Sequence, residues 1–137
     1  MANTPVFPVS IPDIHQQLLW TGLTGCAESL AIANAIEQEN RLFVIVTPDN
    51  QTALQLTHEL AFFLQNRYPI LHFPDWETLP YDVFSPLPEI TSERMKELVL
   101  FTEVKRGAVV VSVHALMNNL AQREHVLANS VAVNVGD

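Results

Sequence analysis

Apolar runs and amphipathic segments alternate along this chain. Leu42–Val46 is an unbroken apolar run, which is typical of a parallel strand that is covered on both faces. Ile70–Phe73 and Ala108–Val113 predict two further strands. A short apolar run predicts a strand at residues 17–21, and strict alternation predicts another at 131–135. Strand-forming segments therefore recur from one part of the chain to the next.

Segments with apolar residues at helical spacing separate these strands. They cover 26–39, a stretch that opens at Thr47 and continues through Leu64, 90–104 and 114–120. Thr47 is expected to cap the second helix, Pro48 to occupy its first position, and Gly107 to close the third. Because strands and helices alternate, we predict an α/β fold: a three-layer, doubly wound parallel sheet with right-handed crossovers.

A proline-rich segment interrupts this pattern at 74–88. Its four prolines exclude a regular helix, and a loop this long in a compact domain is usually functional or tightly packed. We expect three parts in the chain. These are an extended N-terminal arm at 1–15, an α/β domain at 16–128, and, at 129–137, the truncated start of a following domain.

A turn with the outline of a phosphate-binding loop precedes the first predicted helix. In the pattern G-x-x-x-x-G-K-[ST], Gly22 takes the first glycine position and Ser29 the hydroxyl position. Ala27 stands where the second glycine belongs, and Glu28 stands where the lysine belongs. We therefore predict a vestigial loop, made of Gly22, Gly25, Ala27, Glu28 and Ser29, that binds no cofactor.

The replacement of lysine by Glu28 has a calculable consequence. A carboxylate about 4 Å from a phosphate charge repels it by roughly 4 kcal/mol at an effective dielectric constant of 20. Glu28 is expected instead to complement the dipole of its own helix. We expect no catalytic residue here. One alternative stays open: Ser29 and the backbone amides of Gly25 to Ala27 could still hold a Mg-nucleotide, as in an NTP-binding enzyme or switch.

Charge and composition narrow the function further. The 137 residues carry a net charge of −8 with only seven Lys and Arg residues, which disfavours DNA binding and favours a protein partner. Cys26 is the only cysteine, so no intrachain disulfide can form, and we interpret it as a small core residue. No apolar run reaches the length of a membrane span. We expect a cytoplasmic protein that does not contact a membrane.

The sequence gives little support for a metal site or for a functional carboxylate pair. The five histidines have no metal-ligand spacing, and we expect no metal site. Asp75, Glu77 and Asp82 could form a carboxylate pair in the proline-rich segment. A solvated loop face is the preferred interpretation, because no apolar strand ending in acids precedes them. The residues by themselves thus predict an acidic α/β domain with a degenerate phosphate loop.

The proline-rich segment carries a family resemblance. Residues 75–82 read D-W-E-T-L-P-Y-D and are followed by Phe84-Ser85-Pro86 and Ser92-Glu93-Arg94. This stretch resembles the N-terminal region of the bacterial transcription-repair coupling factors, the Mfd family. Supporting matches are Leu23–Gly25, Val44–Asp49, Gly107–Val113 and Ala115–Met117. The resemblance covers about residues 16–137.

The resemblance implies a UvrB-like module, the first domain of the family, with a degenerate P-loop or RecA-like helicase fold. The loop of UvrB resembles an intact G-V-T-G-S-G-K-T. Relative to it, Gly22, Thr24 and Gly25 are retained here, whereas Ala27 and Glu28 replace the glycine and the lysine. Trp76, Tyr81 and Phe84 could stack on bases, although packing against the sheet or a neighbouring domain is preferred.

The same resemblance implies a role within a longer protein. A full-length family member is an ATP-dependent DNA translocase that displaces stalled RNA polymerase and recruits UvrA for nucleotide excision repair. ATP and Mg would belong to its motor domains. This chain would be a non-catalytic scaffold whose partners are other domains of the same protein and, through the full-length protein, UvrA and RNA polymerase. No DNA binding is expected from this part.

Overall fold

The computed structural model describes residues 10–13, 15–75, 88–118, 124 and 128. The elements in these ranges are α1 (Ala27–Gln38), β1 (Leu42–Thr47), α2 (Asn50–Leu64), β2 (Ile70–Phe73), α3 (Pro88–Glu103), β3 (Gly107–Ser112) and α4 (Val113–Met117). The bounds of the three strands agree with those predicted to within one residue. The strand and helix alternation of an α/β protein is confirmed.

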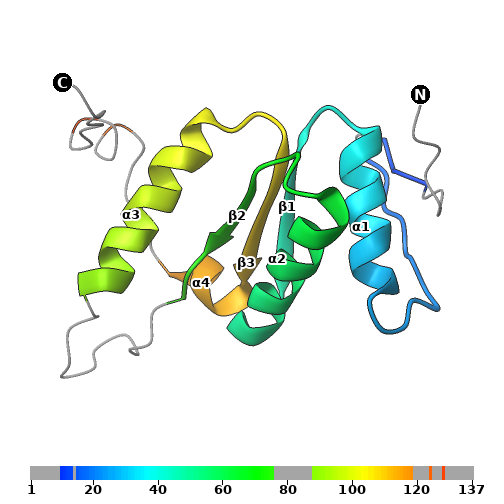
Figure 1. Ribbon diagram of the computed structural model, residues 1–137, viewed down its shortest axis with the longest axis horizontal. Coiled ribbons are helices and arrows are strands. Elements are labelled where there is room, and N and C mark those ends of the chain that lie inside the picture. Colours follow the sequence, from blue (N-terminus) through cyan, green and yellow to red (C-terminus); the bar gives the residue numbers. More distant parts are fainter. Residues whose placement is uncertain (1–9, 14, 76–87, 119–123, 125–127, 129–137) are drawn as a thin grey trace.

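The sheet has three parallel strands in the order β1-β3-β2. β3 lies in the middle, and Val109 is paired with Val44 of β1 on one side and with Leu71 of β2 on the other. Helices α1 and α2 lie on one side of the sheet, and α3 and α4 lie on the other (Figure 1). The predicted three-layer, doubly wound arrangement is therefore correct.

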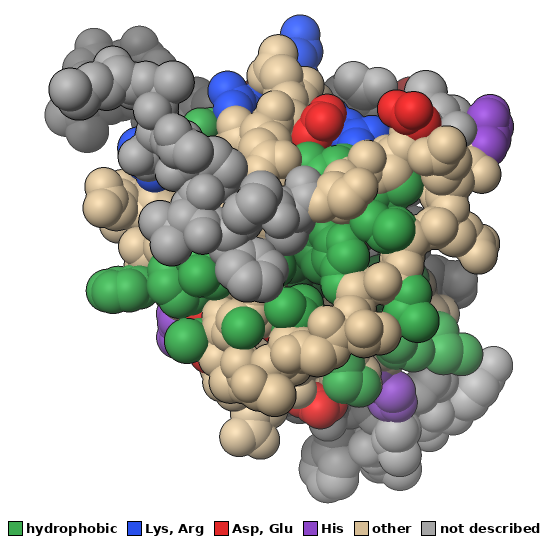
Figure 2. Space-filling model, turned by 90° about the vertical axis from the view of Figure 1, so that its right-hand side faces the viewer, with side chains coloured by type: hydrophobic (Ala, Val, Ile, Leu, Met, Phe, Trp, Pro, Cys, Tyr) green, Lys and Arg blue, Asp and Glu red, His purple; other side chains and the backbone are tan. Residues whose placement is uncertain are grey.

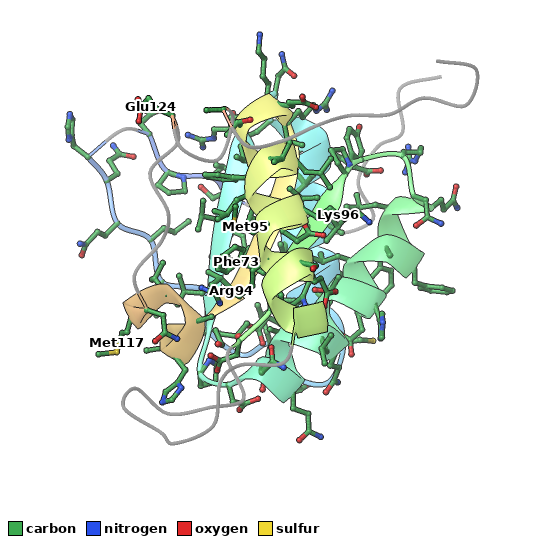
Figure 3. The ribbon with its side chains drawn as sticks, turned by 90° about the vertical axis from the view of Figure 1, so that its left-hand side faces the viewer. Phe73, Arg94, Met95, Lys96, Met117 and Glu124 are labelled. Atoms are coloured by element: carbon green, nitrogen blue, oxygen red, sulfur yellow. The ribbon has the colours of Figure 1, made fainter. Side chains whose placement is uncertain are left out.

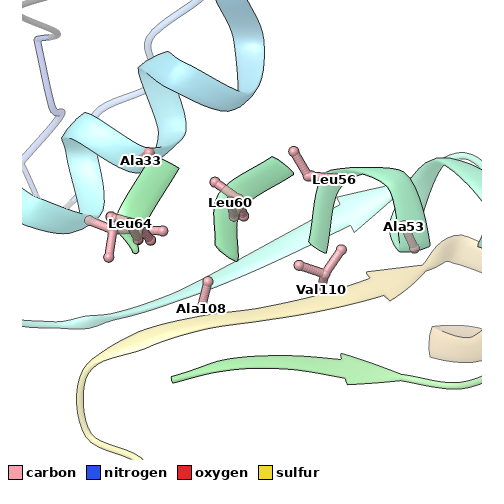
Figure 4. Packing of buried hydrophobic residues seen from close by; sticks show 8 residues of the cluster. Ala33, Ala53, Leu56, Leu60, Leu64, Ala108 and Val110 are labelled. Atoms are coloured by element: carbon pink, nitrogen blue, oxygen red, sulfur yellow. The ribbon is translucent and has the colours of Figure 1, made fainter. Parts of the chain in front are cut away.

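The larger apolar core lies between the sheet and the α1–α2 layer. Three leucines of α2, at 56, 60 and 64, point at Ala108 and Val110 of β3, and Ala33 of α1 closes the cluster (Figure 4). Fully burying a side chain such as Leu60 contributes roughly 1.5–3 kcal/mol relative to leaving it in water. This cluster is the main source of stability for the described fold.

A smaller apolar cluster lies on the opposite face of the sheet. Phe73 of β2 and Val111 of β3 pack there against Ala115 of α4, with Leu98 of α3 at the border. Phe73 lies directly beneath α3, beside Arg94 (Figure 3). Both faces of β3 are therefore covered, as expected from its unbroken apolar sequence.

The strand predicted at residues 17–21 is absent. These residues form no regular element, and Leu19 is 83% exposed. The segment is held only locally, for example by the Trp20 indole, which donates a hydrogen bond to the Ser10 carbonyl at 3.2 Å. A short apolar run becomes a strand only where a neighbouring strand pairs with its backbone, and none does so among the described strands.

Helix α2 begins two residues later than predicted. Asp49, not Thr47, is its N-cap, and the Asp49 carboxylate accepts a hydrogen bond from the Thr52 amide at 2.7 Å. This bond lowers the pKa of Asp49. Thr47 remains in β1, where its hydroxyl donates to the Asp49 carbonyl at 2.9 Å. An aspartate is the better cap because its oxygen is charged.

Gly107 begins β3 and does not close α3, which ends at Glu103. Its φ is +119°, and a Cβ added there would lie 2.1 Å from the carbonyl oxygen of Pro69. The Ala108 amide donates to the same carbonyl at 3.1 Å. The glycine is required by this close approach of two backbone segments, and not by helix termination.

Several predictions fall on residues outside the described ranges. They are the N-terminal arm at 1–9, the aromatic residues Trp76, Tyr81 and Phe84, the acids Glu77 and Asp82, and residues 131–135 with the predicted boundary at 129. These stay predictions. The last helix was predicted to run to residue 120, but α4 ends at Met117, because the backbone of Asn118 is extended. Among the described helices, none combines the length and apolar character that crossing a membrane requires.

Candidate functional site

The loop before α1 keeps the backbone turns of its two glycines. Gly22 and Gly25 have φ angles of +75° and +59°, conformations that residues with a Cβ rarely adopt. The Ala27 amide donates to the Thr24 carbonyl at 3.1 Å, which closes the turn into the helix. No side chain caps the helix at Cys26. The backbone outline seen in the sequence is therefore present, and the side chains decide what it can bind.

The Ser29 side chain is hydrogen-bonded to a residue of another helix. Its side chain is 3% exposed, and its hydroxyl donates a hydrogen bond to the Glu59 carboxylate of α2. Gln55, one turn earlier on α2, donates to the other Glu59 oxygen at 2.8 Å. The Ser29 bond is the main reason why the pKa of Glu59 is lowered. This bond uses the only hydrogen of the Ser29 hydroxyl and places the Glu59 carboxylate directly beside it.

The sequence does not reveal Glu59 as part of this loop. Ser29 and Glu59 are 30 residues apart, and Glu59 sits in an ordinary amphipathic helix. The two meet because α1 and α2 pack side by side on one face of the sheet (Figure 1). Only the packing of the helices brings the carboxylate to the loop.

Glu28 is exposed and makes no hydrogen bond or ion pair with the part of the chain that the structure describes. It borders a hollow of about 410 Å³, whose other lining residues are Leu18, Trp20, Gly22, Leu23 and Ile32. The side of the molecule on which α1 and this loop lie shows hydrophobic side chains gathered at its centre (Figure 2). The hollow has the size of a ligand pocket, but its only charged lining group is a carboxylate, which repels phosphate.

The position of Cys26 differs from the one predicted from the sequence. It is exposed and unpaired, whereas the sequence was interpreted as placing it in the core. The residue sits at the N-cap position, where the chain turns into α1 before the helix reaches its neighbour α2. Ala27, the next residue, is half-buried and begins the helix.

A second polar cluster lies where β2 and β3 end, and it includes Asp75, which was expected to be solvated. Asp75 is half-buried, and the Ser112 hydroxyl and His114 Nδ1 each lie 3.5 Å from its Oδ2 atom. Ser112 also accepts a hydrogen bond from the Ala115 amide at 3.1 Å, which caps α4. The carboxylate is thus tied to β3 and α4 and does not form a solvated loop face.

Arg94 of α3 completes this cluster. The residue is 3% exposed, and its Nη1 atom donates to the Pro74 carbonyl at 2.6 Å. Its guanidinium lies 4.3 Å from the centre of the Phe73 ring, a cation–π contact (Figure 3). Burial lowers the pKa of Arg94, and the charge of Asp75 opposes that effect. The cluster holds the chain at the start of the proline-rich segment, which is a structural role.

Two further residues have shifted pKa values but do not belong to a site. His72 of β2 lies 3.1 Å from the Asn50 side-chain oxygen, and burial lowers the pKa of His72. Glu97 of α3 is half-buried, and burial raises its pKa. Within the described ranges, no three His, Cys, Asp or Glu side chains converge as ligands of a metal ion.

Sequence comparison identifies relatives of two kinds. The chain is 37% identical over 131 residues to the transcription-repair-coupling factor of Haemophilus influenzae, an alignment that covers 92% of this chain and 11% of that protein. It is 32% identical over 121 residues to the transcription-repair-coupling factor of Escherichia coli K12, covering 88% of this chain and 10% of that protein. No protein-family profile matches the chain.

UvrB is the second kind of relative. The UvrABC system protein B of Metamycoplasma arthritidis is 32% identical over 133 residues, covering 89% of this chain and 20% of that protein. The chain spans about a tenth of the length of the coupling factors it matches. The resemblance inferred from the residues is confirmed, and the chain is a homologue of the N-terminal region of the transcription-repair-coupling factors.

Proposed function

We propose that this chain is a non-catalytic scaffold and interaction domain of a transcription-repair coupling factor, and that its degenerate loop holds no nucleotide. The observation that carries the proposal is the bond between the Ser29 hydroxyl and the Glu59 carboxylate. A phosphate loop needs three groups: backbone amides, a lysine and a hydroxyl for Mg²⁺. Here the amides remain, the lysine is Glu28, and the hydroxyl is hydrogen-bonded to the Glu59 carboxylate.

Charge supports the same proposal. Glu28 stands at the lysine position of the loop pattern, and the Glu59 carboxylate lies against Ser29 at the hydroxyl position. The chain as a whole has a net charge of −8. Affinity for DNA depends largely on neutralising its phosphates, so this acidic domain is not expected to hold DNA at physiological salt. An interaction with protein is the remaining role.

The full-length protein supplies the chemistry that this domain lacks. By resemblance to the coupling factors, we propose that it is an ATP-dependent DNA translocase that displaces stalled RNA polymerase and recruits UvrA, with ATP and Mg in separate motor domains. The relatives' names, a transcription-repair-coupling factor and a UvrABC component, support this place in repair. The acidic charge and the degenerate loop fit a domain that acts through protein contacts.

Thermal unfolding with and without millimolar Mg-ATP tests the absence of nucleotide. Ligand at 100 times its dissociation constant stabilises a protein by about 2.7 kcal/mol, a shift of several degrees for a domain of this size. We expect no shift in the wild-type chain. A shift would overturn the proposal and favour the alternative, a switch that retains weak nucleotide binding.

A variant restores the missing groups and serves as the matched comparison. Ala27→Gly with Glu28→Lys rebuilds the loop pattern, and Glu59→Gln removes the second carboxylate while still accepting a bond from Ser29. Nucleotide binding that appears only in the triple variant would show that these side chains block the site. Micromolar DNA binding by the wild-type chain in 150 mM salt, about physiological strength, would contradict the scaffold role.

A further inference from the structure

The hollow beside the loop before α1 combines apolar walls with one charged group. It measures about 410 Å³, within the range of about 300–1,000 Å³ that is typical of ligand pockets. Leucine, isoleucine and tryptophan side chains make up most of its lining, and Glu28 is the only charged residue among them. None of the described residues pairs with the Glu28 carboxylate. The hollow therefore presents an apolar surface together with an unpaired anionic group.

The charges around the hollow favour a cationic ligand. The N-terminus of α1 carries the equivalent of about half a positive charge, which the full negative charge of Glu28 exceeds. Glu59 adds to the negative potential, because its carboxylate is bonded to Ser29, the residue after Glu28. The same bond lowers the pKa of Glu59, so this carboxylate is ionised at neutral pH. An anion is therefore repelled from the hollow, and a cation is attracted to it.

Trp20 favours arginine over lysine as that cation. The Trp20 indole N–H already donates to the Ser10 carbonyl at 3.2 Å, so the ring contributes apolar surface to the hollow and no free donor. A guanidinium group is planar and weakly hydrated, stacks on aromatic rings, and binds a carboxylate through two parallel hydrogen bonds. A lysine ammonium is more strongly hydrated and gains less from apolar walls. An arginine side chain thus matches both the ring and the carboxylate.

The apolar surface continues outside the hollow. Leu18, which lines it, is 48% exposed, and the next residue, Leu19, is 83% exposed. One arginine side chain does not cover these leucines, whereas apolar residues on either side of it in a polypeptide would do so. The net charge of −8 also attracts a basic segment of a partner during association. The surface therefore fits a polypeptide better than an isolated small cation.

We propose that the hollow binds an arginine side chain of a protein partner, with the guanidinium on the Glu28 carboxylate and neighbouring apolar residues of the partner on Leu18 and Leu19. This inference deepens the proposed interaction role and depends on it. A second copy of this chain fits less well as the occupant. Its described arginines already donate hydrogen bonds to other residues: Arg41 to Pro12, Arg67 to Glu37, Arg94 to Pro74 and Arg106 to Tyr68.

A peptide titration followed by NMR tests the specificity for arginine. The probe is the blocked peptide Gly-Leu-Arg-Leu-Gly, and the control peptide carries citrulline, the neutral isostere of arginine, in its place. We expect the arginine peptide to shift the indole N–H resonance of Trp20, which is assigned by its loss in Trp20→Phe. It should bind at least about tenfold more tightly than the citrulline peptide, because hydrogen bonds between charged groups are the stronger ones. Equal binding of the two peptides, or binding of neither, would overturn the proposal.

Two glutamate substitutions separate the hollow from the overall charge. Glu28→Gln keeps the shape of the side chain and should weaken binding of the arginine peptide by at least about tenfold. Glu103→Gln removes the same charge at an exposed position at the end of α3 and should leave the binding unchanged. Both positions are exposed, so both variants are expected to fold. Equal weakening in the two variants would mean that net charge, and not the hollow, attracts the peptide.

Mg-ATP in the same titration separates a failure of this inference from a failure of the proposed function. If neither the arginine peptide nor Mg-ATP shifts the Trp20 resonance, the inference is wrong and the absence of nucleotide from the loop still stands. If Mg-ATP shifts the resonance, both are wrong. Self-association of the wild-type chain that rises with concentration and is lost in Glu28→Gln would identify a second copy as the occupant and would also overturn the inference.

Discussion

The serines of the two polar clusters in this domain have different roles. Ser29 donates to Glu59 across two helices, in a loop whose other polar groups remain open to solvent. Ser112 caps α4 and lies within reach of Asp75, beside the buried Arg94. The first cluster occupies what would be a ligand position, and the second fixes the chain. A polar cluster beside a loop that resembles a phosphate-binding loop is thus not in itself a sign of ligand chemistry.

The largest effect is expected at the second cluster. Arg94→Ala removes a buried charge that bonds the Pro74 carbonyl and covers Phe73, and should lower the free energy of unfolding by about 3 kcal/mol. Urea denaturation measures the loss. Lys96→Ala, at an exposed position on the same helix, is the control and should cost little. Equal losses for the two variants would mean that Arg94 does not anchor the segment after β2.

A matched pair of serine substitutions compares the clusters directly. Ser112→Ala removes the cap of α4 and should cost about 1–2 kcal/mol. Ser29→Ala should cost under about 1 kcal/mol, because the Glu59 carboxylate that loses its partner can be solvated. Urea denaturation at neutral pH would measure both losses in the free energy of unfolding. The reverse order would show that the degenerate loop, and not the strand ends, is the more strongly stabilised cluster.

The smallest effect is a pH dependence at Glu97. Burial raises its pKa in the folded chain above the ordinary 4.5, with a further rise from Glu93 and an opposing effect of Lys96. The folded state therefore holds this proton more tightly, so the contribution of Glu97 to stability is fully present below pH 4.5 and is lost as pH rises through the folded pKa. Glu97→Gln should remove this decline.

The comparison for Glu97 is made at two pH values. Relative to wild type, Glu97→Gln should be more stable at pH 7 than at pH 4, both measured by urea denaturation. Glu103→Gln, an exposed position at the end of the same helix, should show no such difference. A Glu97→Gln effect that is the same at both pH values would contradict the assignment of burial as the cause.

The sequence alone was sufficient for β1, β2 and β3 and for the family. The apolar segments around Val44, Leu71 and Val110 predicted β1, β2 and β3 because unbroken apolar runs are typical of parallel strands. The expected cover on both faces of β1 was wrong, since Val44 and Val46 are exposed, whereas β3 is buried throughout. It also predicted a degenerate phosphate loop, since Ala27 and Glu28 contradict phosphate chemistry by residue type alone. These features depend on local composition and spacing, which a linear sequence carries in full.

Tertiary structure decided what depends on neighbours distant in the chain. Residues 17–21 are not a strand because no described strand pairs with them, and Gly107 is needed because the Pro69 carbonyl approaches it. The Ser29–Glu59 bond joins residues 30 positions apart. Pairing, close approach and burial are properties of two segments at once, and no local pattern specifies which second segment arrives.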